Sequence, residues 1–142
     1  MKITLEHILD SQTPNTFRVA FHSSEQRLLL PYPCVTGLRF IDQSGSTAEW
    51  KCKSLTTGPL DDFVLPPSMR ISFDLCANIN NRSHSALWTI DLLPADYRVH
   101  FEYHVGRETE WYDFIAKRSR FAAETPIWRG SLRSNQLIFH VY

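Results

Sequence analysis

The amino-acid sequence predicts an all-β protein in which two antiparallel sheets pack face to face as a sandwich. Three observations lead to this class. Polarity alternates at every second residue in several short segments, turn-forming clusters separate these segments, and only one stretch has the spacing of an amphipathic helix. A parallel α/β fold needs a helix between successive strands, so the sequence disfavours it.

The clearest strands are TFRVAFH and MRISFDL, which alternate throughout. The apolar residues that share one side are Phe17, Val19 and Phe21 in the first segment and Met69, Ile71, Phe73 and Leu75 in the second. The same pattern indicates strands in KITLEHI, GLRFID, AEWKCKS, LWTID, YRVHFEYHV and NQLIFHVY. Turn signals such as QSGS, TGPLDD and LPAD lie between them, so we expect roughly seven to nine strands.

The helical exception is GRETEWYDFIAKRSRFAAETP, residues 106–126. Trp111, Phe114, Ile115 and Arg118 fall at helical spacing, and Pro126 closes the segment. A connection of this length is uncommon inside a compact domain, and such connections tend to be functional or disordered. We therefore expect a short helix here, inserted between two strands of the sandwich.

The segment LLPAD followed by Tyr97 has the form of a tyrosine corner. In this motif the phenol at the start of strand F bonds back to a nearby backbone group and fixes the crossover between sheets. Val99 stands two residues later, where antibody domains have a cysteine, and the matching inward position on strand B is Val19. The sequence thus predicts aliphatic packing in place of the disulfide between sheets.

Three segments carry a resemblance to a known family: VLPPSMRISFDL, LWTIDLLPADYRVHFEY and PIWRGSLRSNQLIFHVY. Together they resemble the second half of immunoglobulin-like domains of bacterial proteins, including the intracellular proteinase inhibitor family. The likeness is closest over residues 62–141, and it departs from the family at Ser68 and Ala95, where glycine is preferred. It implies an immunoglobulin-like β-sandwich with the helix between strands F and G, and it implies protease inhibition as one function.

Length, charge and cysteine content predict the number of domains, the kinds of partner that are disfavoured and the cellular compartment. A chain of 142 residues predicts one domain spanning residues 1–142. Its 15 basic and 15 acidic side chains balance, which argues against nucleic acid or an anionic membrane as a partner. The odd number of cysteines, Cys34, Cys52 and Cys76, and the lack of an apolar leader near the start predict a cytoplasmic protein with reduced thiols.

His100, Glu102 and His104 form the strongest chemical pattern in the sequence. Residues two apart on a strand project from the same face, which allows a His-x-His pair to bind a transition metal, and His140 belongs to a neighbouring strand. Arg98 lies in the same row, and its charge opposes a metal ion. We therefore predict a polar outer face with no metal and no cofactor, and a small metal-dependent enzyme remains the third reading.

The sequence gives little indication that any serine or cysteine is a catalytic nucleophile. The serines in SGS, NRSHSA and RGSLRSN lack a context that would activate one of them, and SLRSN is typical of a turn into the last strand. Cys52 is the one cysteine flanked by basic residues, Lys51 and Lys53, but activation of its thiol depends on its surroundings. Catalysis is therefore not expected.

Trp111, Tyr112, Arg118 and Arg120 are the predicted partner-binding residues, because aromatic and arginine side chains dominate interface energies. Acidic residues interrupt the basic ones in this region, so single-stranded nucleic acid is not the expected partner. The sequence predicts a non-catalytic protein-binding module, itself a monomer or a weak dimer, whose protein partner is unknown. The alternative is an intracellular protease inhibitor that presents sandwich loops.

Overall fold

The fold consists mainly of strands. The computed structural model describes residues 1–10, 12, 15–52, 61–80, 87–106, 108 and 110–142, without the side chains of Glu110 and Trp111. Its strands are β1 (Lys2–Ile8), β2 (Thr16–His22), β3 (Leu28–Pro31), β4 (Leu38–Ile41), β5 (Trp50–Cys52), β6 (Asp62–Leu65), β7 (Arg70–Cys76), β8 (Trp88–Ile90), β9 (Ala95–Val105), β10 (Gly130–Arg133) and β11 (Leu137–Val141). The described helices are the short 3-10 helix η1 (Val35–Gly37) and α1 (Glu110–Arg118). The predicted all-β class is confirmed.

The first layer is the sheet β1-β2-β7, in which every pairing is antiparallel. In β2 the side chains of Phe17, Val19 and Phe21 are completely buried, and that of Arg18 reaches Asp74 across the outer face. The predicted alternation of this strand is thus present, with its apolar side toward the core.

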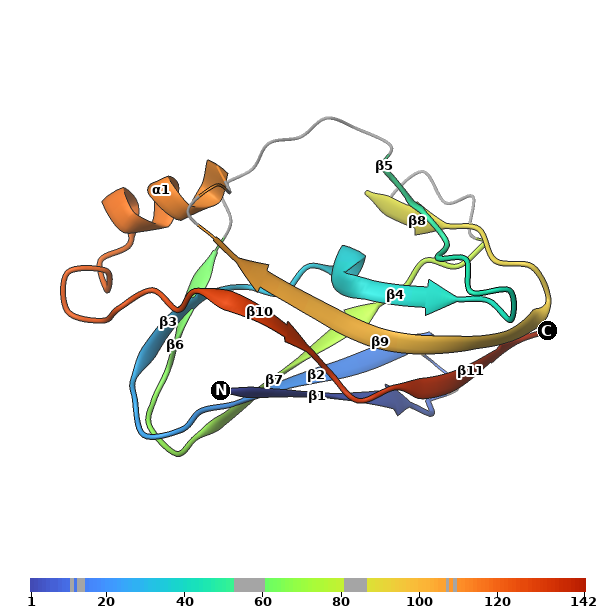
Figure 1. The fold of residues 1–142 in the computed structure, drawn as a ribbon, viewed down its shortest axis with the longest axis horizontal. Helices are drawn as coiled ribbons and strands as arrows, with labels where there is room; N and C mark the ends of the chain where they lie inside the picture. Colours follow the sequence, from blue (N-terminus) through green and yellow to red (C-terminus); the bar gives the residue numbers. More distant parts are fainter. Residues whose placement is uncertain (11, 13–14, 53–60, 81–86, 107, 109) are drawn as a thin grey trace.

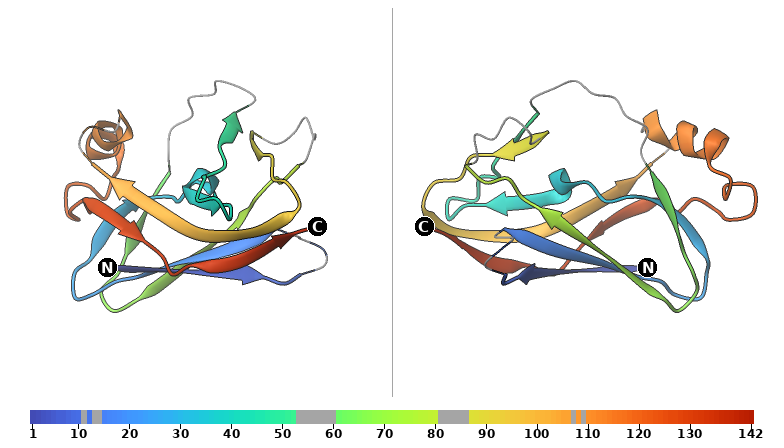
Figure 2. Two further views of the ribbon diagram at one scale, coloured as in Figure 1. Left: turned by 45° about the vertical axis from the view of Figure 1, so that its right-hand side comes forward. Right: turned by 180° about the vertical axis from the view of Figure 1, so that it is seen from behind.

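The second layer is built around the long strand β9. Its Val99 faces Phe40 of β4 on one side, while β11 and β10 pair in succession along the other side. Figure 1 shows this layer lying across the sheet β1-β2-β7. Two further antiparallel pairs, β3-β6 and β5-β8, extend the ends of the molecule, and Figure 2 shows them from two other directions.

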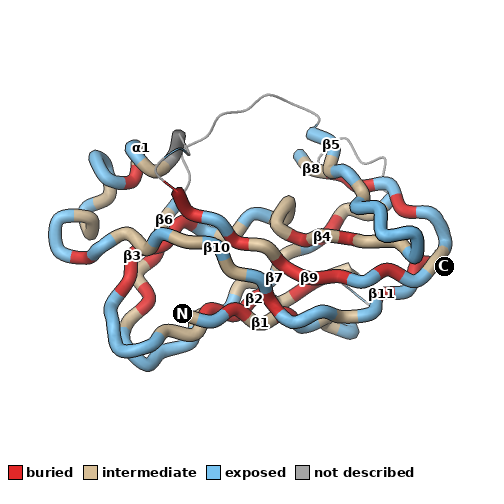
Figure 3. The backbone as a smooth tube through the Cα atoms, in the orientation of Figure 1, coloured by how far each residue is buried: buried red, intermediate tan, exposed pale blue. Residues whose placement is uncertain are grey.

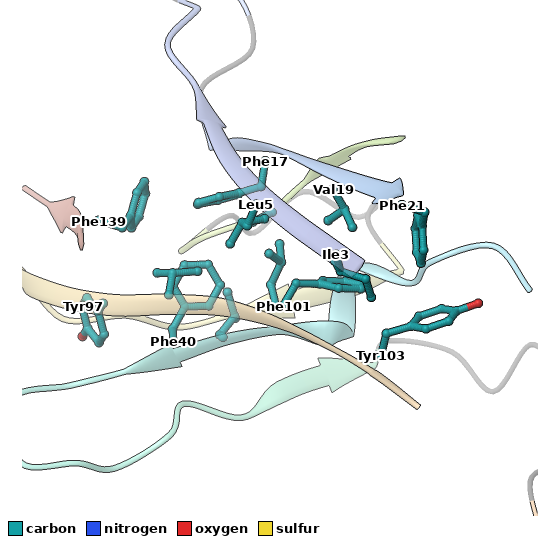
Figure 4. Close-up of a cluster of buried hydrophobic side chains, with 14 of the residues drawn as sticks. Ile3, Leu5, Phe17, Val19, Phe21, Phe40, Tyr97, Phe101, Tyr103 and Phe139 are labelled. Carbon is teal, nitrogen blue, oxygen red and sulfur yellow. The ribbon is translucent and has the colours of Figure 1, made fainter. Parts of the chain in front are cut away.

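The core fills the space between the two layers. Figure 4 shows Phe17, Val19 and Phe21 of β2 pointing toward side chains of β4 and β9, among them Phe40 and Phe101. The rings of Phe17 and Phe40 lie 5.8 Å apart in an edge-to-face arrangement, the geometry that aromatic pairs favour. In Figure 3 buried residues follow β2 and β9, while α1 is mostly exposed or half-buried.

The predicted corner is present at the start of β9. The hydroxyl of Tyr97 donates a hydrogen bond of 3.0 Å to the carbonyl oxygen of Leu93, and the tyrosine side chain is buried. Val19 and Val99 are both fully buried in the core cluster, and all three cysteines are free. Ser68, where the resemblance would lead us to expect glycine, adopts a φ of 57°, in the left-handed region that glycine favours.

Several elements differ from the prediction. β3 lacks a clear signal in the sequence, because all four of its residues are buried and a fully buried strand does not alternate. β6 alternates in burial, but it has only four residues, and three of them in a row are apolar. Gly130–Arg133 forms strand β10, although the overlapping segment SLRSN was predicted to be a turn. The helix is also shorter than the predicted segment, since α1 ends at Arg118.

Within the described residues, no helix has both the length and the apolar character required to cross a bilayer.

Candidate functional site

The predicted polar row of β9 is present, with one exception. The side chains of Arg98, Glu102 and His104 lie on the outer face of the strand and are partly or fully exposed, as the alternation predicts. His100 belongs to the same row but is buried, with only 3% of its surface exposed. The expectation of a uniformly solvated face is therefore wrong at His100.

Glu102 is the centre of an ionic network on this face. Its Oε1 accepts hydrogen bonds from Nε2 of His100 at 3.0 Å and from Nη2 of Arg133 at 3.1 Å, and its Oε2 accepts one from Nε of Arg39 at 3.2 Å. The hydrogen bond from His100, followed by the charges of these cations, lowers the pKa of the Glu102 carboxyl. Glu102 is therefore ionised at neutral pH and links β9 to β4 and β10.

His104 forms a separate chain of contacts. Its Nδ1 lies 2.6 Å from Oγ of Ser131 in β10, and its Nε2 lies 2.6 Å from Oε1 of Glu108. The bond from His104 lowers the pKa of the Glu108 carboxyl. Sequence reasoning did not single out Ser131 and Glu108 as a pair, because only the antiparallel register brings Ser131 opposite His104.

This Ser131-His104-Glu108 chain has the composition of a catalytic triad, but its members are connected in a different order. In serine hydrolases the serine meets Nε2 of the histidine and the carboxylate meets Nδ1, which is the reverse of the order here. About half of the His104 side chain and more than half of the Glu108 side chain are exposed, at 52% and 69%. Water therefore competes for each of these bonds.

The weak metal candidates His100, Glu102 and His104, and His140 on the neighbouring strand, are all engaged in contacts with other side chains. His100 and Glu102 bond each other, His104 is occupied by Ser131 and Glu108, and His140 bonds Asp96. Among the described residues, no group of three His, Cys, Asp or Glu side chains is arranged to hold a metal ion.

An open cavity of about 220 Å³ lies beside the Glu102 network. Tyr32, Thr36, Arg39, Glu102 and His104 are among the residues that line it. A second hollow of about 510 Å³ shares Thr36 and Arg39 with the first, and Trp50 and Trp88 form part of its wall. The sequence gives no sign of the cavity beside Glu102, because η1 and β4 meet β9 there only in the tertiary fold.

The insertion after β9 contains the other predicted site residues. Arg118 and Arg120 are exposed, as a binding role requires. Tyr112 is half-buried and packs against the core, so it offers a partner less surface than the two arginines do. Trp111 belongs to α1, but its side chain lies outside the described part of the structure.

Each of the two arginines lies over an aromatic ring. Cζ of Arg118 is 5.3 Å from the centroid of the Phe114 ring, and Cζ of Arg120 is 4.7 Å from that of Phe121. These distances are within the range of a cation–π interaction. Phe114 and Arg118 are four residues apart on α1, so helical spacing alone brings them together.

Of the other candidate nucleophiles, the two serines of SGS lie in a turn, and Cys52 is exposed beside Lys51. Ser44 and Ser46 donate their backbone N–H groups to the Asp42 carboxylate and form a turn, and Lys51 pairs with Asp91 at 2.6 Å. Lys53 and the segment NRSHSA, residues 81–86, lie outside the described residues.

Comparison of this chain with models of protein families, with curated proteins and with solved structures finds no match.

Proposed function

We propose that this chain is a non-catalytic protein-binding module whose partner docks on the insertion between β9 and β10. The observation that carries the proposal is the pair of exposed arginines, Arg118 and Arg120, each held over a half-buried aromatic ring. With Lys117 they give this surface three exposed cations beside the half-buried rings of Phe114 and Phe121. The partner surface that fits it combines carboxylates with apolar groups.

The proposal includes an immunoglobulin-like arrangement of the sheets. In it, β1, β2 and β7 correspond to strands A, B and E, while β4, β9 and the pair β10 and β11 correspond to C, F and G. The strand order of both sheets and the Tyr97 hydroxyl bond at the start of β9 support this assignment. The insertion then occupies the loop between F and G, at one end of the sandwich.

The ring contacts favour binding because they restrict the arginine side chains before a partner arrives. Ordering a free arginine side chain at an interface costs roughly 0.5–1.5 kcal/mol. A guanidinium that already lies over Phe114 or Phe121 has lost part of that freedom in the unbound chain. A guanidinium that stacks on a ring can still meet a carboxylate in plane through its N–H groups.

The base of the insertion is anchored to the sandwich. Ile115 of α1 is buried with 2% of its surface exposed. Further along, the backbone of Leu29 in β3 accepts a bond from the N–H of Trp128 and donates one to the carbonyl of Pro126, both at 3.0 Å. The insertion therefore has a packed side and a charged side, and loss of the charged side need not unfold the packed one.

The test is the double substitution Arg118→Glu with Arg120→Glu, compared with Arg27→Glu plus Arg98→Glu as a control. All four arginines are exposed, and the control pair lies outside the insertion. Proteins captured from cell extract by wild-type chain are identified by mass spectrometry, and thermal melts are recorded for all variants. We expect the first variant to lose capture with an unchanged melting temperature, while the control retains it. Retained capture by the first variant would remove both arginines from the binding surface.

A further inference from the structure

Other parts of the chain cover several strand edges among the described residues. Unpaired backbone groups along an edge can pair with a strand from another chain, and proteins commonly block such edges. On β1 the side chain of Asn135 bonds both backbone groups of Leu5. On β4 the Trp50 indole donates to the carbonyl of Leu38, and the Ala48 N–H donates to that of Phe40. On β3 the backbone of Leu29 bonds residues 126 and 128. β11 lies close to β1, and its Phe139 ring contacts His7.

The outer edge of β7 is different. Two flanking bonds, from Ser23 N to Met69 O at 3.0 Å and from Ala77 N to Asn15 O at 2.9 Å, set the phase of its ladder with β2. Odd-numbered residues of β7 therefore direct their backbone groups toward β2, and even-numbered residues direct theirs away from the sheet. The outward groups belong to Arg70, Ser72, Asp74 and Cys76, all exposed, and none of them meets a hydrogen-bond partner within the described part of the chain.

β7 also lacks several of the features that usually protect an edge strand from pairing, although Arg70 and Asp74 give it two charged side chains. It runs for seven residues in continuous register with β2, without a bulge, a proline or a lysine. In the view from behind in Figure 2, β7 lies in front at the border of its sheet. On its core side Ile71, Phe73 and Leu75 are only half-buried, and Met69 just before the strand is 53% exposed. An apolar row therefore borders the open backbone edge.

We propose that β7 pairs antiparallel with β7 of a second copy of this chain, about a two-fold axis at Ser72. In this register the outward backbone groups of Arg70, Ser72 and Asp74 meet those of Asp74, Ser72 and Arg70 of the second copy. The two sheets join into one sheet of six strands, in an isologous interface. These residues are separate from those of the insertion, so the dimer leaves the proposed partner surface free.

The charges of Arg70 and Asp74 favour this register over the one with the two-fold axis at Phe73. Arg70 has no ion-pair partner among the described residues, whereas Asp74 bonds Arg18 at 2.7 and 3.0 Å. With the axis at Ser72, Arg70 faces Asp74 of the second copy twice over. With the axis at Phe73, it would instead face Cys76, and both ion pairs would be lost. Opposite charges directly across an antiparallel pair are stabilising.

The apolar row is self-complementary in the same register. Ile71 faces Phe73 of the second copy, and Met69 faces Leu75. These pairs occupy the sites between ladder bonds, where side chains from neighbouring strands approach most closely. Pairing would cover the half-exposed apolar groups and both open edges at once, which indicates a second copy as the occupant.

The first test interrupts the edge with Ser72→Pro. The N–H of Ser72 points away from β2, so proline there removes no bond of the sheet, and edge strands tolerate proline in this orientation. Sedimentation velocity from micromolar to millimolar concentration should show a concentration-dependent dimer for the wild-type chain and a monomer for the variant. A wild-type chain that stays monomeric throughout overturns the proposal and leaves the edge to a strand of a different protein.

The second test uses charge complementation. Arg70→Glu and Asp74→Lys each place like charges across the axis, so each variant alone should dimerise at least about tenfold more weakly. Mixed together, the two variants restore both opposite-charge pairs, and a heterodimer of wild-type strength should form. Arg98→Glu, which changes an exposed arginine on β9, is the matched control and should dimerise normally. Failure of the mixture to restore the dimer would reject this register.

Discussion

The side-chain amide of Asn135 pairs with both backbone groups of Leu5. Oδ1 of Asn135 accepts the Leu5 N–H at 2.8 Å, and Nδ2 donates to the Leu5 carbonyl at 3.0 Å. Leu5 lies in the middle of β1, and Asn135 lies between β10 and β11. One side chain thus substitutes for a neighbouring strand, connects the two layers and closes the edge of β1.

Replacing Asn135 with alanine should destabilise the fold by roughly 1–3 kcal/mol, because two backbone groups of the buried Leu5 lose their partners. Urea unfolding followed by tryptophan fluorescence measures the change. Asn78→Ala is the control, since among the described residues the side chain of Asn78 donates only one long bond, of 3.5 Å, to the carbonyl oxygen of Trp88. Equal effects of the two substitutions would show that the Asn135 contact adds nothing specific.

Tyr97→Phe should retain the fold and lower its free energy of unfolding by about 0.5–1.5 kcal/mol. Phenylalanine fills the same buried space, but the bond from the tyrosine hydroxyl to the Leu93 carbonyl is lost. Chemical denaturation measures the difference. Tyr142→Phe removes a hydroxyl from a side chain that is 99% exposed, so it should leave stability unchanged. A Tyr97 variant as stable as wild type would contradict a stabilising role for the corner.

Phe17→Ala should cost roughly 3–5 kcal/mol, whereas Phe73→Ala should cost clearly less. Phe17 is fully buried, and the centroid of its ring lies 5.8 Å from that of Phe40 and 5.3 Å from that of Phe139. Phe73 has the same place in its sequence pattern, but it lies on an edge strand and is only half-buried. Denaturation at low protein concentration compares the two. An equal loss would show that burial at the β7 edge is more complete than in this structure.

Phe17 and Phe73 also show what sequence patterns predict well. Alternation of period two identifies the strands β2 and β7 and the face of each that points inward, because it reflects the local geometry of an extended chain. It cannot tell a central strand from an edge strand, since that depends on which strands become neighbours. The same pattern therefore gives full burial at Phe17 and partial exposure at Phe73.

The same distinction, between contacts set by local geometry and contacts set by the tertiary fold, applies to the candidate sites. The contact of Arg118 with Phe114 follows from helical spacing and could be anticipated from the sequence. The network around Glu102 could not, because Arg39 and Arg133 reach it from β4 and β10. For the same reason the burial of His100 and the cavity beside Glu102 have no signal in the sequence.

The last prediction concerns the pH dependence of the Glu102 network. The hydrogen bond from His100 and the nearby arginines hold the pKa of Glu102 in the folded chain below its unfolded value, which is about 4.3. Its contribution to stability is therefore complete above about pH 4.3 and is lost as the pH falls through the lower folded pKa. Because Glu102 is 37% exposed, solvent screens part of this effect.

We expect Glu102→Gln to lower stability at pH 7 and to flatten the decline of stability in acid, since glutamine cannot titrate. Urea midpoints measured between pH 7 and pH 3 compare the variant with wild type and with Glu25→Gln, which changes an exposed glutamate outside the network. The Glu25 variant should follow the wild-type curve. If the Glu102 variant also follows the wild-type curve, shifted by a constant amount, then the carboxylate of Glu102 does not contribute to the acid sensitivity of the fold, and its bonds to His100 and the arginines act only as neutral hydrogen bonds would.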